Sequence, residues 1–514
     1  MKVDFIINAH PEVTRIGILE DNRLMEIIVE GSNEKRQVGN IYLGKVNAVL
    51  PGMQAAFVDI GLERSAFLHV SDIRTSAMDT AKFARSLASG SPMGTREAHD
   101  SIEKVLKKGQ NILVQVTKEP IGTKGARVTT RVSIAGRYIV SMPGESVTGI
   151  SRKISDRSER GRLRKILSSV KIPGFGIIAR TAGISRDEKA FSKDMETIVD
   201  RWKEIGQSVL KKKAPALLHQ EQDIVTIAMR DLVTDDTNSI VTDSRQVARD
   251  ARKYLKTFAS NMTGKVKLYR GKTPIFDHFG IEQEIAGIMA REVPLKSGGS
   301  LVIEHTEALV AIDVNTKKYV GRKKQENTIL KTNLEAAREV ARQLRLRDLG
   351  GIIVIDFIDM DIADHKDKVL SALRTELGRD RSPTKTCQVS SMGLVEMTRK
   401  RVRPSVFQAL SEPCTCCGGS GRVMSVISTA TRLERFIERA SLDKKNRNLV
   451  VSIHPVIAEF LYEEEGRRMD HISSVSQLSI EFREDPKLRV DEFRVYSLDL
   501  HEEITSLYNR SGNS

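Results

Sequence analysis

The stretch ALVAIDVN (residues 308–315) indicates how the central part of this chain folds. Its apolar run ends in Asp313, and GGIIVIDFIDMD (350–361) repeats the pattern with Asp356. Runs that are apolar on both faces are typical of strands buried in a sheet. LVIEHTE precedes the first run, so 301–315 is expected to form a hairpin. The stretch NTILKTNLEAAREVARQLRLRDLGG between the runs has helical periodicity and ends in a glycine pair. Strand, helix and strand together predict an α/β unit.

The two aspartates are candidate metal ligands. An aspartate in a buried strand is costly unless it is paired, hydrogen-bonded or bound to a cation. Neighbouring strands would bring Asp313 and Asp356 together, and Asn315 faces the same side because side chains alternate along a strand. Mg²⁺ takes one or two protein carboxylates plus waters and a phosphate oxygen. The sequence therefore predicts a Mg²⁺ site, beside a basic segment, TKKYVGRKK (316–324), that would lie along a phosphate backbone.

A simpler interpretation of these residues stays open. Asp313 and Asp356 would then cap strand ends or pair with the arginines of the intervening helix. The neighbouring polar residues fit structural roles: Asp359 and Asp361 are interpreted as loop or helix-entry residues, and His305 as a turn residue.

Composition limits the class of protein. The 514 residues allow about three or four domains, and 40% hydrophobic with 29% charged residues is typical of a globular chain. Apolar runs such as GIIVI are too short to cross a bilayer, and the N-terminus has no secretory pattern. Four cysteines, three of them crowded, favour a reducing compartment. We therefore expect a cytoplasmic protein without stable membrane insertion. The net charge of +15 favours a polyanionic partner, although proteins that are merely basic share it.

Residues 38–128 predict a small β-barrel. Short strand patterns are separated by PG and IG turns, and Phe57 and Phe67 stand on successive strands. OB barrels bind single strands by stacking bases on such aromatic rings beside basic residues, here Lys118 and Lys124. The alternative is that both phenylalanines belong to the barrel core. Residues 74–102, rich in Ser, Ala and Gly, are interpreted as a flexible insertion.

The stretch CTCCGGSGR (414–422) contains half of a zinc site. Cys414 and Cys417 have C-x-x-C spacing, whereas tetrahedral zinc takes four ligands. The sequence has no second C-x-x-C motif, and Cys387 lies alone. Among the later histidines, His454 is the candidate for a further zinc ligand. The simplest completion is a second copy of the motif across a two-fold axis. Cys416 is then a spare thiol or a competitor of Cys417. A redox dithiol and a chaperone-type zinc repeat are weaker alternatives, because glycines follow the pair and only one copy occurs.

Several motifs together resemble the ribonuclease E/G family of bacterial endoribonucleases. They are TEALVAIDVN, TNLEAAREVARQLRLRDLGGIIVIDFIDM, GLVEMTRKR and C-x-x-C-x-G-x-G. The resemblance runs from residue 1 to about residue 422, and residues 38–128 resemble the S1 type of OB fold. In length the chain is similar to the shorter members of the family, without the long scaffold that organises a degradosome.

The resemblance implies an activity. Asp313 and Asp356 match the family's catalytic Mg²⁺-binding aspartates, and Asn315 matches the asparagine that assists them. The family cleaves single-stranded RNA, leaving 5′-phosphate and 3′-hydroxyl ends, in rRNA and tRNA maturation and in mRNA decay. A non-catalytic RNA-binding or ribosome-assembly factor is the alternative from a different class.

The resemblance also implies binding residues. Arg180 and Thr181, in IIARTAG (177–183), match the pocket that senses a 5′-monophosphate, and Arg152 in GISRKI assists them. Phe57, Phe67 and Lys124 match RNA-contacting positions. The cysteine motif implies one Zn²⁺ shared by two chains, in a homodimer or a homotetramer.

These expectations combine into an α+β multidomain chain. The resemblance implies that an S1-type OB barrel is inserted in an RNase-H-like subdomain, and that a deoxyribonuclease-I-like catalytic subdomain and a zinc link follow, before a small C-terminal α/β domain. The expected boundaries are 1–37 with 216–280 (RNase-H-like), 38–128 (barrel), 129–215 (5′-phosphate sensor), 281–403 (catalytic), 404–424 (zinc link) and 425–514 (C-terminal).

Overall fold

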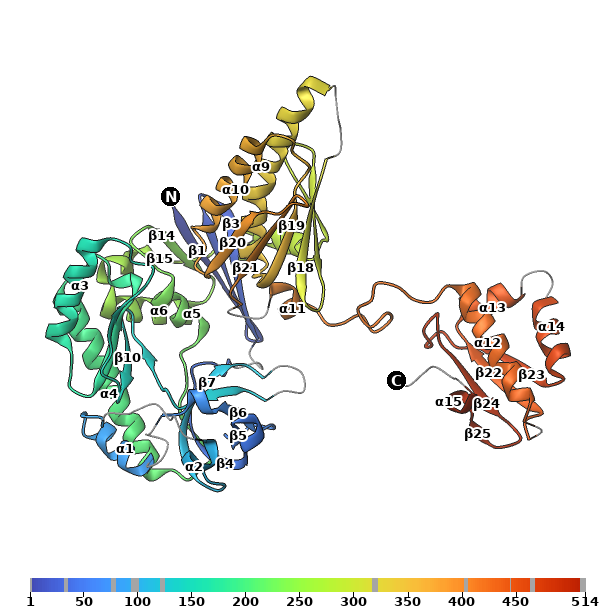
Figure 1. Cartoon of the computed structure of the whole chain (residues 1–514), viewed down its shortest axis with the longest axis horizontal. Coiled ribbons are helices and arrows are strands. Elements are labelled where there is room, and N and C mark those ends of the chain that lie inside the picture. Colours follow the sequence, from blue (N-terminus) through green and yellow to red (C-terminus); the bar gives the residue numbers. More distant parts are fainter. Residues whose placement is uncertain are drawn as a thin grey trace. The chain divides into compact units, whose positions relative to one another are not determined.

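The computed structural model of the chain contains two compact units, 1–409 and 410–514. It describes residues 2–31, 36–74, 80–93, 101–120, 125–316, 322–401, 405–443, 445–462 and 467–508. Among the helices in these ranges, none combines the length and the apolar character that crossing a bilayer requires. Figure 1 shows the chain coloured along its sequence.

The first unit begins with a five-stranded sheet in the order β15-β14-β1-β2-β3. The alternating segments DFIINA, TRIGILE and RLMEIIVEG predict three strands, and this is confirmed by β1, β2 and β3. Strand β1 also pairs in parallel with β14, which comes much later in the chain. Helices α5 and α6 pack on this sheet through a common apolar core. The bounds are β1 (Val3–Ala9), β2 (Val13–Glu20), β3 (Arg23–Gly31), α5 (Ile224–Asp231), β14 (Thr237–Thr242), α6 (Arg245–Phe258) and β15 (Val266–Leu268).

A closed β-barrel follows the first three strands. Its strands are paired in the order β4-β5-β6-β8-β7, and pairing of β4 with β7 closes the ring. Alternate residues of each strand point inward and form the barrel core, and β13 (Ala216–His219) pairs with β4 on the outside of the ring. The barrel strands are β4 (Ile41–Leu50), β5 (Ala55–Asp59), β6 (Ala66–His69), β7 (Asn111–Lys118) and β8 (Arg127–Thr129).

The segment predicted to be a flexible insertion contains an ordered helix, so that prediction is wrong for its described part. Helix α1 (Thr80–Ala88) buries Phe83 and Leu87 against α4 (Glu188–Lys211). These two apolar residues lie four positions apart and therefore share one helix face. The abundance of Ser, Ala and Gly around them hid this short amphipathic pattern.

A second, smaller sheet has the order β11-β12-β10-β9 and shares an apolar core with residues of the barrel strands β4 and β7. Helices α3 and α4 cover one face of this sheet, with Trp202 fully buried in the shared core. Strands β11 and β12 are parallel, so their carboxyl ends meet at one edge. The bounds are β9 (Ile134–Ala135), β10 (Ile139–Pro143), β11 (Thr148–Ile150), α3 (Arg157–Val170) and β12 (Phe175–Ala179).

The candidate catalytic residues lie on a six-stranded sheet in the order β16-β17-β18-β19-β21-β20. The predicted hairpin is confirmed as β17 and β18, and a helix connects β18 to its parallel neighbour β19. Helices α9 and α10 cover one face of the sheet (Figure 1). The bounds are β16 (Glu292–Pro294), β17 (Ser300–His305), β18 (Leu309–Asn315), α9 (Arg322–Leu346), β19 (Gly351–Asp356), α10 (Ala363–Leu377), β20 (Thr384–Val389) and β21 (Leu394–Arg399).

The prediction that β18 and β19 are buried on both faces is wrong. Burial alternates along both strands, and the second face is open: Ile352 on that face is 52% exposed. The sequence looked apolar on both faces because the open face carries Leu309, Ala311 and Val354. These side chains are half-buried although that face is open. His305 is the last residue of β17 rather than a turn residue, whereas Asp359 and Asp361 lie in the loop before α10, as predicted.

Helix α9 packs on the six-stranded sheet and also against β3 of the N-terminal sheet. Its C-terminal half is therefore buried nearly all round, including its charged side chains. Arg345, 4% exposed, lies 2.5 Å from Glu20 and 2.9 Å from Glu26. Arg342 contacts Glu284 at 3.1 Å. The two sheets are thus joined by a shared helix and by ion pairs that cross between them.

The second unit is a four-stranded sheet in the order β23-β22-β24-β25 with helices around it. β22 and β23 are parallel and are connected by helices α13 and α14, whereas β24 runs antiparallel to β22. Its bounds are α12 (Val426–Ser441), β22 (Asn448–Ile453), α13 (Pro455–Tyr462), α14 (Arg467–Ser476), β23 (Ser479–Glu484), β24 (Phe493–Ser497), β25 (Glu502–Glu503) and α15 (Thr505–Tyr508).

Candidate active site and nucleic-acid interface

Asp313 and Asp356 lie directly opposite each other on the parallel strands β18 and β19. Both side chains are exposed on the open face of the sheet. The Nδ2 atom of Asn315 donates a hydrogen bond of 2.8 Å to Oδ2 of Asp313, which confirms that these two side chains share a face. The strand register therefore brings together the three residues that the sequence singled out.

The electrostatics of this pair favour a cation. The pKa of Asp356 is raised by partial burial and then by the negative charges of Asp313 and Asp359. Two arginines of α9 have other partners: Arg342 pairs with Glu284 and Glu339, and Arg345 pairs with Glu20 and Glu26. Pairing of Asp313 or Asp356 with Arg342 or Arg345 is therefore not what the structure shows.

The residues at this position fit Mg²⁺. Two exposed carboxylates on one sheet face supply hard oxygen ligands and leave room for water and phosphate oxygens. Within the described ranges, no group of three or more His, Cys, Asp or Glu side chains could enclose a metal. Of the basic segment at 316–324, residues 317–321 lie outside the described residues.

Sequence reasoning missed a residue that supports this site. Asn333 on α9 is fully buried, and its amide makes two hydrogen bonds to Ile358, in the loop after Asp356. A single asparagine in the apolar stripe of a long helix was the available signal, because buried polar side chains need a specific partner.

Phe57 and Phe67 form an aromatic pair on the outer surface of the barrel. They lie opposite each other on β5 and β6, and their rings meet edge to face with centroids 6.1 Å apart. Both are half-buried and lie outside the barrel core, so the alternative that they are core residues is wrong. Arg127 pairs in register with Phe67 on one side and with Lys118, which is exposed, on the other. Lys124 lies outside the described residues.

The predicted phosphate-sensing residues gather at one edge of the second sheet. Arg180 and Thr181 follow β12 directly, and Arg152 follows the parallel strand β11 by two residues. Thr181 and Arg152 are exposed. Arg180 is held in place, because its guanidinium donates to the carbonyl oxygen of Gly136 (2.5 Å) and to Oδ1 of Asp231 (2.7 Å).

Asp231 belongs to a buried charge network that the sequence did not reveal. Its carboxylate also accepts a hydrogen bond from Arg230, which in turn contacts Glu221 at 3.0 Å. Burial alone would raise the pKa of Asp231, but the hydrogen bonds and charges of Arg230 and Arg180 outweigh burial and lower the pKa. Asp231 is therefore an ionised partner that orients Arg180.

The cysteine motif forms a tight turn that brings two thiols together. The pKa of Cys417 is lowered by hydrogen bonds from the backbone N–H groups of Gly421 and Gly419, and then by one from the Cys414 thiol. Three glycines of the turn have positive φ angles, 60° at Gly418, 94° at Gly419 and 69° at Gly421. A lowered thiol pKa and two adjacent sulfurs suit a half-site for Zn²⁺ formed by Cys414 and Cys417. The other candidate ligand, His454, accepts the backbone N–H of Val456 at the start of α13.

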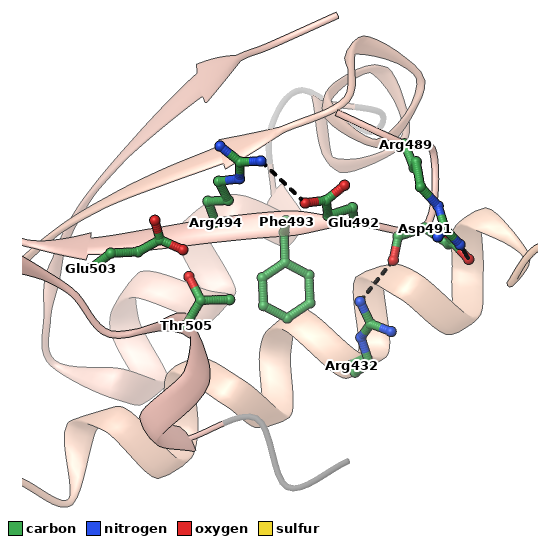
Figure 2. Close-up of a pocket in the computed structure, with 8 residues that line it drawn as sticks. All are labelled: Arg432, Arg489, Asp491, Glu492, Phe493, Arg494, Glu503 and Thr505. Atoms are coloured by element: carbon green, nitrogen blue, oxygen red, sulfur yellow. Dashed lines mark hydrogen bonds and ion pairs between the residues drawn. The ribbon is translucent and has the colours of Figure 1, made fainter. Parts of the chain in front are cut away.

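The second unit carries a cavity of about 320 Å³, which is shown in Figure 2. Most of its charged side chains are engaged within the unit: Arg489 pairs with Asp491, Arg494 with Glu492, and Arg432 stacks over Phe493. Acidic and basic residues balance in number, so the cavity has no excess charge to select a phosphate or a cation. We assign it no catalytic role.

Comparison with known protein families covers most of the chain. A profile described as "Ribonuclease E/G family" matches residues 133–402, and one described as "S1 RNA binding domain" matches residues 35–131. A third, "RNase E/G, Thioredoxin-like domain", matches residues 413–498. The resemblance was expected to end near residue 422, so that limit is wrong. Residues 425–514 contain no cysteine, which gives this segment no dithiol of its own.

Individual relatives agree with these matches. The chain is 37% identical to ribonuclease G of Escherichia coli strain K12 over 96% of its own length and 99% of that protein. It is 38% identical to ribonuclease G of Haemophilus influenzae over 90% of this chain and 93% of the relative. For ribonuclease E of the same organism the identity is 38% over 98% of this chain, which corresponds to 53% of the longer relative. Full-length identity at this level and the profile match over residues 133–402 place the chain in the ribonuclease E/G family.

Proposed function

We propose that the chain is a Mg²⁺-dependent, single-strand-specific endoribonuclease whose active site contains Asp313 and Asp356. Membership of the family makes the chain an endoribonuclease with RNA as its substrate. The observation that carries the finer proposal is the register of β18 and β19, which sets the two aspartates opposite each other on an exposed sheet face. A phosphodiester has room to approach this face, whereas the opposite face is closed by α9 and α10.

The chain's own residues perform three tasks in this proposal. Asp313 and Asp356 would hold the cation, and Asn315 fixes the orientation of Asp313 through its hydrogen bond. Asn333 fixes the loop that follows Asp356. When bound, the cation supplies positive charge that offsets the charge developing on the phosphoryl oxygens. Water attacks phosphorus and the O3′ atom departs, so the fragments carry 5′-phosphate and 3′-hydroxyl ends.

The second sheet would select the 5′ end of the substrate. Arg180, Thr181 and Arg152 lie at the shared carboxyl edge of β11 and β12. Guanidinium and hydroxyl groups suit a dianionic monophosphate, for which charge-assisted hydrogen bonds are strong. The barrel surface at Phe57, Phe67 and Lys118 would bind the single strand, and Lys124, outside the described residues, is proposed from the sequence as a further RNA contact. Processing of rRNA and tRNA precursors and mRNA decay would use this preference.

Two chains would share one Zn²⁺. Each contributes Cys414 and Cys417, and the hydrogen bond between these thiols favours this pair over one that includes Cys416. The result is a homodimer or, with a further contact, a homotetramer. We assign 1–37 with 216–280 to an RNase-H-like subdomain, 281–403 to a deoxyribonuclease-I-like one and 404–424 to the zinc link. The cytoplasmic location stays a prediction.

The proposal is tested with a 5′-monophosphorylated, single-stranded oligoribonucleotide and the full chain. Asp313→Asn and Asp356→Asn should abolish internal cleavage while equilibrium binding of the RNA survives, and activity should require added Mg²⁺. Asp364→Asn is the matched control, because this exposed aspartate pairs with Lys368 on α10. Normal cutting by both active-site variants would show that the active site lies elsewhere. Binding without cleavage by the unaltered chain would instead favour the non-catalytic RNA-binding factor.

A further inference from the structure

A pocket of about 250 Å³ lies at the junction of the barrel and the second sheet. Its apolar wall comes from Val132, Met142, Pro143, Val147 and Ile178, and its rim from Arg74, Thr130, Arg131 and Glu145. Val147 is 48% exposed although it is an aliphatic side chain on this wall. The pocket is smaller than the ~300–1,000 Å³ that holds a drug-sized ligand, so it suits a single flat group.

The rim of the pocket is basic and is fixed across the junction. Arg74, next to the barrel, contacts Glu145 of the second sheet at 3.1 Å, with side chains 13% and 15% exposed. Arg131 is exposed and donates to the carbonyl oxygen of Ser71. Lys171 donates to Ser146 and Thr148, the two residues that flank Val147. The cations around the exposed apolar wall give this junction a positive surface.

A short series of contacts links the pocket to the aromatic pair on the barrel. Phe67 pairs with Arg127, whose guanidinium binds Asp72 at 2.8 Å. The carbonyl oxygen of Asp72 accepts the backbone N–H of Thr130, which lines the pocket. One short run of contacts therefore leads from the stacking surface to the pocket.

We propose that this pocket binds one unpaired nucleotide of the RNA substrate, with the base against Val147 and Met142 and the adjoining phosphate beside Arg131. The proposal rests on the proposed function, because it places part of the same single strand. Bases splayed from a strand bind on apolar and guanidinium planes, and phosphates bind basic rims. On the other wall Ile178 precedes Arg180 by two residues. The pocket therefore lies between the barrel surface and the phosphate-sensing edge.

The test measures RNA binding to the full chain that carries Asp356→Asn to prevent cleavage. Val147→Glu places a carboxylate on the exposed apolar wall and should weaken binding of a 5′-monophosphorylated oligoribonucleotide about tenfold, the order of one lost base contact. Val456→Glu is the matched control, because Val456 is 42% exposed on α13 of the other unit. This control should bind like the parent, and thermal unfolding should show that both variants are folded.

Two further measurements test nucleotide binding in the pocket without relying on Val147→Glu, in case that variant does not fold. Arg131→Gln should reduce the slope of log affinity against log salt by about 0.7, the value for one phosphate contact on a single strand. An oligonucleotide with 4-thiouridine should cross-link to the peptides that carry Met142 or Val147. The proposed nucleotide site would be wrong if Val147→Glu bound RNA with full affinity, Arg131→Gln kept the parent's salt slope and cross-links formed only at the barrel. In that case Phe67→Ala should still weaken binding, because the barrel surface would remain an RNA contact. Loss of RNA binding by the parent chain itself would overturn the proposed function instead.

Discussion

Asn333 binds the backbone of Ile358 with both ends of its side-chain amide. Its Nδ2 atom donates to the carbonyl oxygen at 2.8 Å, and its Oδ1 atom accepts the N–H at 3.1 Å. Ile358 lies two residues after Asp356, so the helix on the covered face fixes the chain where it leaves β19, the strand that ends in Asp356. The position of one of the two candidate ligands therefore depends on a side chain that cannot reach the substrate.

Asn333→Asp should reduce cleavage and raise the Mg²⁺ concentration needed for half-maximal activity. An ionised aspartate cannot donate to the Ile358 carbonyl, and leaving a buried polar group unpaired costs about 1–3 kcal/mol. A Mg²⁺ titration of the cleavage rate measures the effect. Asn446→Asp is the control, because Asn446 is also buried and donates to a backbone carbonyl, that of Ala440 in the other unit. If Asn333→Asp had an unchanged Mg²⁺ requirement, Asn333 would stabilise the fold without positioning Asp356.

Arg180→Lys should lower the preference for 5′-monophosphorylated over 5′-hydroxyl RNA by roughly tenfold. Lysine keeps the charge but lacks the planar fork that lets Arg180 bind Gly136 and Asp231 while it faces a phosphate. The ratio of kcat/KM for the two substrates measures the preference. Arg186→Lys, which alters a nearby arginine paired with Asp235, should leave the ratio unchanged. Equal ratios in the parent and in Arg180→Lys would remove Arg180 from the sensing site.

Titration of Asp194 should lower the free energy of unfolding as the pH rises. This carboxylate is buried and accepts the backbone N–H groups of Arg137, Tyr138 and Ile139. Burial raises its pKa above the ordinary value of 3.8, although the three hydrogen bonds oppose the shift. The folded state thus holds the proton to higher pH than the unfolded state, and the free energy of unfolding falls as the pH rises from about 4 through the folded pKa.

Asp194→Asn removes this titration. The difference in the free energy of unfolding between the parent and Asp194→Asn should therefore change with pH across that window and become constant above it. Denaturant unfolding at a series of pH values measures the difference. Parallel curves for the two proteins would contradict the raised pKa of Asp194.

Metal analysis of the purified chain should find about one zinc for two chains, because four thiolates complete one tetrahedral site. Cys414→Ser should shift the oligomer toward monomer and weaken cleavage, whereas Cys387→Ser should change neither, since Cys387 is an exposed thiol of the strand β20 and is not part of the C-x-x-C motif. Sedimentation velocity measures the association. One zinc per chain would contradict a site shared between two chains.

The strands and the βαβ arrangement around Asp313 were predictable because their signals are local. Alternation of apolar residues identified β1 to β3, and two similar runs around a helical stretch identified β18, α9 and β19. The parallel register could not be read from these patterns. It depends on how α9 packs on the sheet, and only that packing sets Asp313 opposite Asp356 rather than one residue out of step.

The supporting residues were not predictable for a related reason. Asp231 orients Arg180 from a helix 51 positions further along the chain, and Asn333 reaches Ile358 across 25 positions. Neither distance leaves a periodic pattern in the sequence. The open face of the catalytic sheet was also missed, because half-buried aliphatic residues there have the same composition as buried ones.

The ion pairs of Arg345 with Glu20 and Glu26 limit how this nuclease can be inherited. A recombination event that moved residues 281–403 into another gene would carry Arg345 but neither Glu20 nor Glu26. Breaking a buried ion pair by removing one partner costs about 3–5 kcal/mol. That loss is comparable to the whole stability of a small domain. The six-stranded sheet and the N-terminal strands should therefore have descended together as a single heritable piece, although β3 ends at Gly31 and β16 begins only at Glu292.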